Sequence, residues 1–562
     1  MLTFQTKKIK DKFSVIKFQV FILIIICIIL GTTFKGNNDI YDKINRNMDV
    51  FGKVYKEVAI NYVDAVDVDK FFEAGIEGML ATLDPYTVYY DDKNRDAIDL
   101  ITTGKYGGIG ITIGIKDSIM KITDIMTGYE AQRKGLRIGD IIKEINGTST
   151  SDIQIEKLRQ MVRGTPGTTL NFKIDRDGEI INFELTREEI ILKNISYSGF
   201  IGNPEDGIAY LKLDRFTMNA ENEVDNTLRT FKSKNTFKGV IFDLRDNGGG
   251  LLEAAIGTVN KFVNKNNLLL TTRGNSKDSE KKFFAKDEPL ITSDIPLVLL
   301  INGNTASASE IVAGAIQDLD RGVIIGSKSF GKGLVQQVKD LNSDSRLKIT
   351  IARYFTPSGR WIQSKNYFKE NKSGVFLNTE TFMQNEFKTL NGRTVYANGG
   401  ITPDVEIKVE GESEIHSALL MKDMFFKFAN YYLSQNPNIK TFKCSDNIYN
   451  QFEDFVKNQN FDYKSGEDKK IDELKQSASK KYYSANYFNY LNQLEEEIRK
   501  EKEIEFEKAK DEIKRNIESE INKRIITETA QIEATFDNDL QLQEAIKVIK
   551  DKISYIKLLN NM

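Results

Sequence analysis

Two short segments of the sequence hold side chains that together could cleave a peptide bond. The first, NGNTASASE at 302–310, follows an apolar run at 297–301 and leads into small residues that are expected to be helical. Ser307 would lie on the sharp turn between strand and helix, where the helix N-terminus favours negative charge. The plainer alternative is that this serine only caps the helix and that its small neighbours allow close packing.

The second segment contains a lysine that could serve as the base. An apolar run at 322–325 leads to SFGKGLVQ at 329–336, in which Lys332 stands between two glycines. Desolvation penalises the charged form of a lysine, so an amine confined in a cleft can accept a proton near neutral pH. Gln336 follows four residues later and could orient the amine by a hydrogen bond. A flexible surface turn is the alternative for Gly-Lys-Gly.

A glycine-rich segment could stabilise the negative charge that develops during such a reaction. The sequence DLRDNGGG at 243–250 begins at the end of an apolar strand predicted at 239–244. Consecutive glycines let backbone N–H groups point at a ligand without interference from a Cβ atom. Such a loop suits an oxyanion hole, completed by the amide of Ala308 directly after the serine. A plain glycine turn is the alternative.

The composition argues against most other hydrolytic sites. The 562 residues include one histidine, His416, so a Ser-His-Asp, Cys-His or multi-histidine metal site would have to be built on that residue. Its surroundings predict a partly exposed helix residue. The two cysteines, Cys27 and Cys444, are too few for a disulfide framework or a zinc site. With 79 basic and 81 acidic residues, no nucleic-acid partner is expected, and the chemistry requires no metal or cofactor.

A β-rich module is predicted between about 104 and 187, where short apolar runs alternate with Gly and Asp turns. Its segment GGIGI forms a loop of backbone amides that leads into a strand, an arrangement that can capture a terminal carboxylate while the strand edge pairs with a peptide. Together with GLRIGDII at 135–142, this indicates a PDZ domain; a structural glycine hairpin is the alternative. We expect Ile109 and Ile111 to line a pocket for an apolar C-terminal side chain. The expected peptide-binding residues are Gly107, Gly108, Ile109, Gly110 and Ile111.

The three loop motifs, in this order and spacing, resemble those of the carboxyl-terminal processing proteases, also called tail-specific proteases. The similarity covers roughly residues 45–408, and supporting matches are LDPYT at 83–87, ARYFTPSGR at 352–360 and GGITPD at 399–404. The resemblance implies that Ser307 is the nucleophile, Lys332 the base and Gln336 the third member of the site. It also implies that Gly249 or Gly250, with Ala308, forms the oxyanion hole. One departure is Gly248, where many relatives have proline.

The resemblance also implies a function. We expect a serine endopeptidase that cleaves exported proteins near their C-termini, with the PDZ domain binding the apolar tail of the substrate. Family members use this domain as a gate, and Arg163 is the candidate for reporting tail occupancy to the active site. The alternative is a catalytically inactive PDZ adaptor that scaffolds partners at the membrane.

The expected fold class is multidomain α/β: an α/β protease core with an inserted β-rich PDZ domain, an N-terminal helical segment and a C-terminal α-helical extension. Strands and helices alternate through the core, which is the pattern of an α/β sandwich. The expected boundaries are 1–35 for a signal or membrane anchor, 39–100 for the helical region, 104–187 for the PDZ domain, 190–408 for the protease core and 410–562 for the extension.

Both ends of the chain suggest interactions beyond the core. Five lysines precede an apolar run at 18–30, which indicates export. We favour an uncleaved single-pass anchor over a cleaved signal, with the catalytic part periplasmic or otherwise outside the cytoplasm. Near the other end, an apolar residue recurs every fourth position, which predicts a helix that packs on its own domain or forms a homodimer contact. The repeating residues are Ala509, Ile513, Ile517, Ile521 and Ile525.

Overall fold

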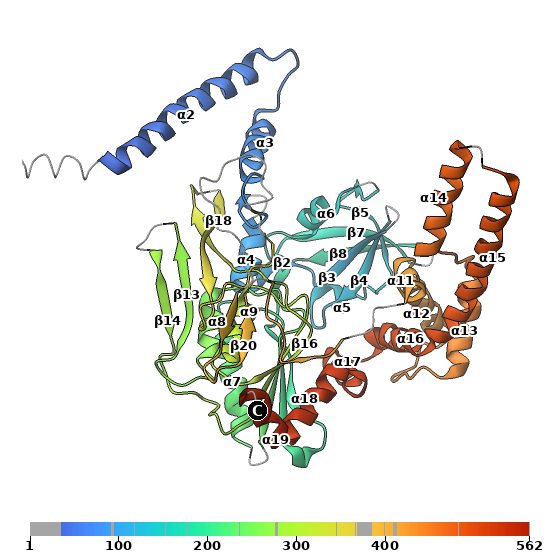
Figure 1. The fold of residues 1–562 in the computed structure, drawn as a ribbon. Coiled ribbons are helices and arrows are strands. Elements are labelled where there is room, and N and C mark those ends of the chain that lie inside the picture. The colour runs from blue at the N-terminus through green and yellow to red at the C-terminus, as the bar shows by residue number, and fades with distance from the viewer. Residues whose placement is uncertain are drawn as a thin grey trace, which may run out of the picture. The chain divides into compact units, whose positions relative to one another are not determined.

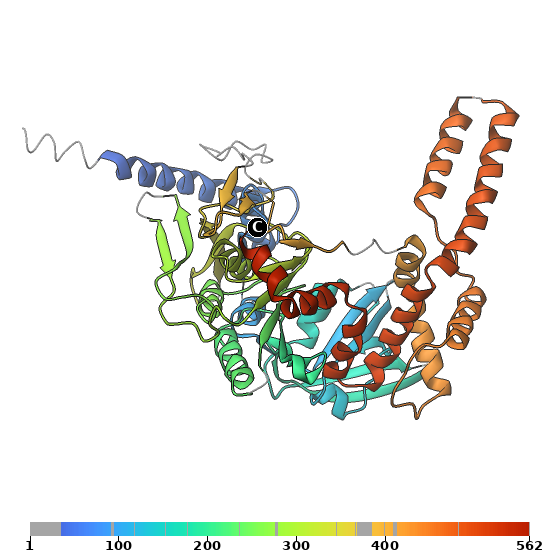
Figure 2. The same ribbon diagram turned by 60° about the horizontal axis from the view of Figure 1, so that its bottom comes forward.

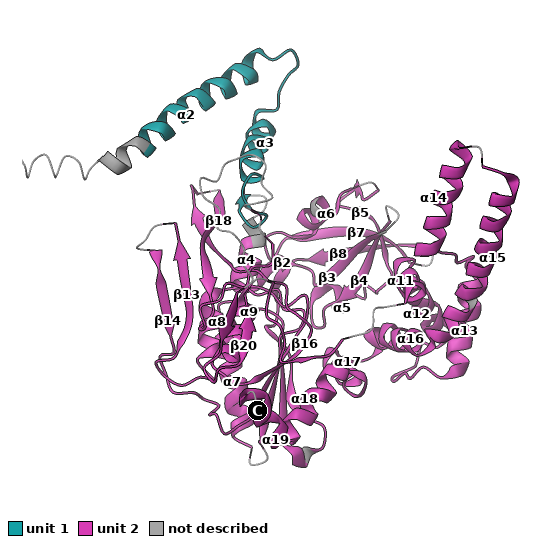
Figure 3. Ribbon diagram, viewed as in Figure 1, with its two compact units in different colours: residues 1–89 teal, residues 90–562 magenta. Residues whose placement is uncertain are grey.

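The structure is a computed structural model that separates into two compact units, residues 1–89 and 90–562 (Figure 3). The described residues are 35–91, 95–116, 119–151, 153–176, 178–234, 237–275, 279–343, 345–365, 367, 385–397, 399–408, 413–481 and 483–560.

The first unit contains two helices, α2 (Lys35–Asn61) and α3 (Val68–Leu80). Tyr55 of α2 stacks on Phe71 of α3 with 5.5 Å between ring centroids, and Asp67 caps α3 by accepting a hydrogen bond from the Lys70 amide at 3.2 Å. None of the helices in the described part of the chain is long and apolar enough to span a bilayer. The apolar run at 18–30, on which we based the anchor, lies outside the described residues.

A six-stranded sheet forms the centre of the second unit (Figure 1). Its order is β10-β11-β12-β15-β16-β21; β10 is antiparallel to β11, and the other five strands are parallel. Because parallel strands end at the same edge, the loops after β12, β15 and β16 meet there. The bounds are β10 (Ile195–Ile201), β11 (Ile208–Leu213), β12 (Gly239–Asp243), β15 (Leu297–Ile301), β16 (Val323–Gly326) and β21 (Val405–Glu406).

Helices bury both faces of this sheet, which explains why its central strands are apolar throughout. One face packs against α7 (Ala220–Lys232), α8 (Leu252–Val259) and α9 (Ala308–Asp318). The other face packs against α18 (Leu540–Lys550) and α19 (Lys552–Asn560), at the end of the chain. A second sheet combines β13 (Leu268–Gly274), β14 (Lys281–Phe284), β17 (Leu334–Asp340) and β18 (Arg346–Phe355).

The β-rich module has its own sheet and its own core. The sheet order is β3-β4-β5-β7-β8, with β6 paired to β5, and β3 is an edge strand. A separate pair, β2 (Lys105–Gly108) with β9 (Glu188–Ile191), lies where the module begins and ends. The other bounds are β3 (Ile111–Lys116), β4 (Ile119–Ile125), α5 (Glu130–Arg133), β5 (Ile141–Ile145), β6 (Thr148–Ser149), α6 (Ile155–Val162), β7 (Thr169–Arg176) and β8 (Glu179–Thr186).

The helices after residue 413 divide into two groups. Those up to α16 build a separate core into which Ala509, Ile513, Ile517 and Ile521 are buried. This confirms that the apolar stripe packs within its own domain. Figure 2 shows α14 and α15 running side by side, linked by a 2.7 Å ion pair between Lys475 and Glu495. The bounds are α11 (Glu414–Met421), α12 (Met424–Gln435), α13 (Asp446–Asn458), α14 (Gly466–Lys480), α15 (Ala485–Lys508), α16 (Lys510–Ile525) and α17 (Glu528–Thr535).

His416 lies in the first of these groups, on α11 as expected for a helix residue. It is buried rather than partly exposed, with Nδ1 3.1 Å from Glu512 and Nε2 2.6 Å from the Asn516 amide.

Candidate active site

Ser307 occupies a strained turn between β15 and α9. Its φ of 56° and ψ of −115° lie in a region that non-glycine residues rarely adopt, and such strain persists only where the surroundings enforce it. Tyr354 contributes to that enforcement, because its buried hydroxyl donates to the Ser307 carbonyl oxygen at 3.2 Å. The turn therefore holds the serine at the N-terminus of α9, as the sequence predicted.

A carboxylate that we did not anticipate connects this serine to the lysine loop. Oε2 of Glu310 accepts the backbone N–H of Ser307 at 2.8 Å and that of Lys332 at 2.9 Å. Its other oxygen, Oε1, accepts the Gly331 N–H and the Ser329 hydroxyl, both at 2.6 Å. Two backbone nitrogens 25 residues apart in the sequence thus contact the same oxygen atom, which brings the predicted nucleophile and base segments together.

Glu310 is fully buried, and this environment changes its acidity. Burial raises the pKa of the Glu310 carboxyl to about 7, although the Ser329 hydroxyl and the backbone N–H groups of Lys332, Gly331 and Ser307 favour the charged form and oppose the rise. The sequence did contain a signal for this residue, because a glutamate three positions after a serine N-cap is the capping-box pattern. Its contacts with the loop at 329–332 were not readable from that pattern.

The glycine loop after β12 packs directly against the serine turn. A Cβ atom on Gly249, whose φ is 100°, would come within 2.9 Å of Ser307 Cβ and the Ala308 nitrogen. The Gly249 N–H donates to Asn247 Oδ1 at 2.9 Å. Among the described residues, no acceptor is recorded for the N–H groups of Gly250 and Ala308. The predicted oxyanion residues are therefore adjacent, and Gly250 and Ala308 have the available donors.

The lysine loop is held by further contacts on its other side. The carbonyl of Gly333, directly after Lys332, accepts the indole N–H of Trp361 at 2.9 Å. Gln336 lies on β17, and its Nε2 donates to Thr350 Oγ1 of β18 at 3.2 Å. Orientation of the Lys332 amine by Gln336 stays a prediction.

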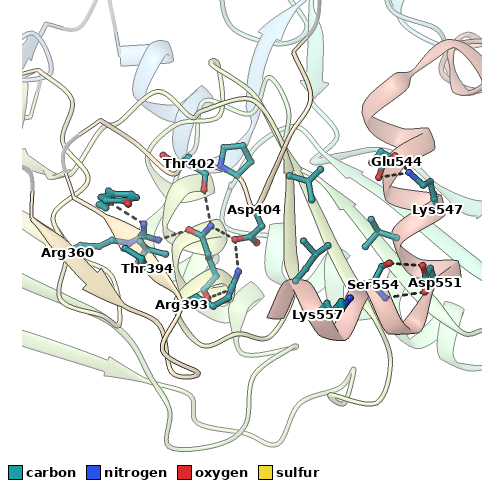
Figure 4. Close-up of a pocket in the computed structure, with 17 residues that line it drawn as sticks. Arg360, Arg393, Thr394, Thr402, Asp404, Glu544, Lys547, Asp551, Ser554 and Lys557 are labelled. Atoms are coloured by element: carbon teal, nitrogen blue, oxygen red, sulfur yellow. Dashed lines mark hydrogen bonds and ion pairs between the residues drawn. The ribbon is translucent and has the colours of Figure 1, made fainter. Parts of the chain in front are cut away.

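Two of the sequence blocks that supported the resemblance, 352–360 and 399–404, contact the C-terminal end of α9. Arg360 pairs with Asp318 of α9 at 2.7 Å, and Asp404 accepts a hydrogen bond from the side-chain amide of Gln317, in the same helix, at 2.8 Å. Arg360 and Asp404, both labelled in Figure 4, line a cavity of about 780 Å³ beside α18 and α19. The residues that line this cavity belong to neither the serine turn nor the lysine loop. We therefore interpret these blocks as structural support for the helix that carries Ser307.

The predicted peptide-binding segment occupies two strands and the turn between them. Gly107 and Gly108 lie in β2 and pair with β9, whereas Ile111 begins the edge strand β3. Ile109 is 1% exposed and packs in the core of the module, with Ile111 against it. Gly110 has a φ of 79°, which favours glycine at this turn. An edge strand after a glycine turn suits pairing with an extended peptide.

Arg163 lies at the C-terminal end of α6, with its guanidinium carbon 4.9 Å from the centre of the Tyr106 ring. Tyr106 belongs to β2, at the start of the module. The predicted sensor thus contacts the segment through which the module joins the core.

Known protein families match four consecutive parts of the chain. Residues 207–370 match peptidase family S41, residues 98–175 the PDZ domain, residues 415–549 the helical domain of a probable PDZ-protease, and residues 32–94 the N-terminal domain of the activating protease CtpB.

Curated relatives agree with these matches. The carboxy-terminal-processing protease of Bartonella bacilliformis is 36% identical over 344 residues, which is 60% of this chain and 76% of the relative. The carboxy-terminal processing protease CtpA of Bacillus subtilis is 31% identical, over 60% of this chain and 70% of its own length. The chain therefore belongs to peptidase family S41, among the PDZ-containing carboxy-terminal processing proteases, which are serine-type peptidases.

Proposed function

We propose that Ser307 and Lys332 form the catalytic dyad of a peptidase that cleaves exported proteins near their C-termini. The observation that carries this proposal is the single Glu310 oxygen that binds the backbone nitrogens of both residues. A shared anchor fixes the separation of two loops that come from different strands, and catalysis depends on such positioning.

In the proposed reaction, the neutral Lys332 amine accepts the Ser307 proton as Oγ attacks the scissile carbonyl carbon. The N–H groups of Ala308 and of Gly250 or Gly249 stabilise the negative oxygen. The protonated amine then gives its proton to the departing nitrogen, which leaves an acyl ester on Ser307. A water molecule cleaves this ester by the same proton transfers, so serine and lysine are regenerated.

The PDZ domain selects the substrate in this proposal. An extended C-terminal tail pairs with the edge strand β3, and its carboxylate binds at the turn around Gly110. Apolar tails are preferred because Ile111 begins that strand and is itself apolar. We place the enzyme outside the cytoplasm, tethered by the N-terminal segment, because lysines precede an apolar run there.

The test compares the wild type with Ser307→Ala and Lys332→Ala on an unfolded protein substrate. We expect both variants to lose cleavage while keeping the unfolding temperature of the wild type. A Lys332→Ala variant with near-normal turnover would rule out the dyad. If the wild type bound the C-terminal tail of a substrate but cleaved none of it, the adaptor alternative would be favoured.

Substrate selection is tested with two forms of one peptide, with a free and an amidated C-terminus. Amidation removes the terminal charge, so we expect weaker binding and slower cleavage of the amidated peptide. Equal cleavage of the two forms would rule out carboxylate recognition.

A further inference from the structure

The loop that carries the oxyanion glycines contains an arginine bound to a buried acid. Asp243, at the end of β12, is 0% exposed and accepts the Tyr210 hydroxyl and the Arg245 guanidinium, both at 2.6 Å. Burial by itself would raise the pKa of Asp243, but the charge and hydrogen bonds of Arg245 outweigh it and hold this pKa below its usual range. Arg245 is thus required to compensate a charge inside the core.

A second carboxylate reaches this arginine from the end of the chain. Asp539 lies directly before α18 and forms a two-point pair with Arg245, with distances of 2.9 Å from Nη1 to Oδ1 and 2.7 Å from Nη2 to Oδ2. Gln541 accepts a further bond from Nη1 at 3.1 Å. Two parallel bonds fix the plane of a guanidinium more firmly than a single contact does. The side chains of Arg245 and Asp539 are only 14% and 18% exposed, so solvent screens the pair weakly.

Arg245 lies a few residues before the oxyanion glycines, and Asn247 between them is hydrogen-bonded both to the glycines and to the serine turn. Asn247, two residues later, accepts the Gly249 N–H through its side chain. The Asn247 carbonyl accepts the Ala306 N–H at 3.0 Å and the Ser309 hydroxyl at 2.9 Å. A shift of Arg245 would therefore move both the glycines and the turn that carries the serine.

The helix that presents Asp539 is itself firmly placed. Leu542, Ala545 and Val548 of α18 are buried against the sheet, in the same cluster as Ile241 of β12 and Leu300 of β15. Just before α18, the Phe536 ring packs edge-on against Tyr210 with 5.3 Å between centroids. The carboxylate is thus held by a packed element rather than by a surface loop.

We propose that Asp539 is a positioning residue for the oxyanion loop, so that the C-terminal helices supply part of the protease machinery. The inference rests on the proposed function, because it assumes that Gly249 or Gly250 binds the oxyanion. Asp539 does not touch substrate; it acts by holding Arg245 and, through it, residues 246–250.

The test uses Asp539→Asn and Asp539→Ser, which keep a helix-capping side chain. Asp539 also accepts the Leu542 N–H at 3.0 Å, and Asn and Ser can replace it there but cannot form the charged pair with Arg245. The matched control is Asp551→Asn, because Asp551 accepts the N–H and hydroxyl of Ser554 at the start of α19. Ser307→Ala is measured in parallel, with a fluorogenic peptide as the substrate.

We expect both Asp539 variants to lower kcat about tenfold or more, with KM and the unfolding temperature close to wild type, because oxyanion contacts form mainly in the transition state. Asp551→Asn should leave kcat unchanged. The inference is overturned if both Asp539 variants keep the wild-type kcat, or if kcat, KM and unfolding temperature all fall together. If the wild type shows no cleavage that Ser307→Ala abolishes, the proposed function fails and this inference with it.

Discussion

At the scale of single residues, Glu310 is the group on which the site depends most. Each of its oxygens accepts two hydrogen bonds, and the four donors come from both sides of the proposed dyad. A carboxyl group keeps an acceptor lone pair on both oxygens whether it is ionised or protonated, so it can accept the N–H groups on both sides, whereas the nitrogen of an amide accepts none.

Glu310→Gln is therefore expected to be disruptive despite its similar shape. The amide would turn an NH₂ group toward two of the donors, leaving buried N–H groups without acceptors. We expect the free energy of unfolding to fall by about 3 kcal/mol and cleavage to fall roughly a hundredfold, because misplaced reacting groups cost that much. Cleavage assays and urea unfolding measure these effects. Glu253→Gln, at an exposed position in the first turn of α8, is the control. Normal turnover by Glu310→Gln would contradict the bridging role.

The acidity of Glu310 predicts a pH dependence of stability. Burial raises its pKa from 4.5 to about 7, so between these values the folded protein keeps a proton that the unfolded chain releases. The stabilisation that this proton provides is therefore complete below the unfolded pKa and is lost as pH rises through the folded pKa. Over that range the free energy of unfolding should fall by about 3 kcal/mol.

This pH dependence is tested by urea unfolding, monitored through the fluorescence of Trp361, which lies beside the lysine loop. Trp361 is the single tryptophan of the chain and bonds to Gly333. Since glutamine cannot titrate, the stability deficit of Glu310→Gln relative to the wild type should narrow from about pH 5 to about pH 8. A constant deficit would show that Glu310 does not titrate in this range.

At the scale of elements, the parallel strands determine where the motifs meet. Asp243, Ile301 and Gly326 end three neighbouring parallel strands, so the glycine loop, the serine turn and the lysine loop extend from one sheet edge. Close approach there leaves no room for a side chain at Gly249.

Gly249→Ala tests this close approach. The added Cβ would lie within 2.9 Å of Ser307 Cβ and the Ala308 nitrogen, at a φ that disfavours alanine, so the two loops must separate. We expect cleavage of a peptide to fall at least a hundredfold. Gly248→Ala should be near neutral in the same assay, because nothing lies within 4 Å of its Cβ position. Equal effects of the two substitutions would argue against a specific contact at Gly249.

The sequence predicted elements well where local pattern determines them. The strand expected at 297–301 is β15, and the helix expected near 153–162 is α6. Burial of His416 was missed, because its neighbours Glu512 and Asn516 come from a helix about a hundred residues later. The pair of Arg245 with Asp539 spans 294 residues, and neither residue has a local pattern that indicates it. Contacts of this kind depend on tertiary packing rather than on propensity.

At the scale of the whole chain, the C-terminal extension is two structures rather than one. Residues 414–525 form a helical domain with its own core, whereas α18 and α19 complete the core of the protease by covering one face of its sheet. Tyr555 of α19 illustrates this, because its hydroxyl accepts the Leu297 N–H of β15 at 3.0 Å. Removing residues 410–562 would therefore expose an apolar sheet face as well as delete a domain.

Leu542→Ala tests whether α18 belongs to the protease core. Leu542 is 0% exposed against the sheet, so its truncation leaves a cavity and should lower the free energy of unfolding by about 3 kcal/mol. Leu540→Ala, in the same helix at 65% exposure, should change it little and serves as the control. The measurement is urea unfolding followed by Trp361, which lies in the protease core rather than in the helical extension. If the Leu542 variant lost stability without changing that transition, α18 would unfold independently and could not hold Asp539 against the oxyanion loop.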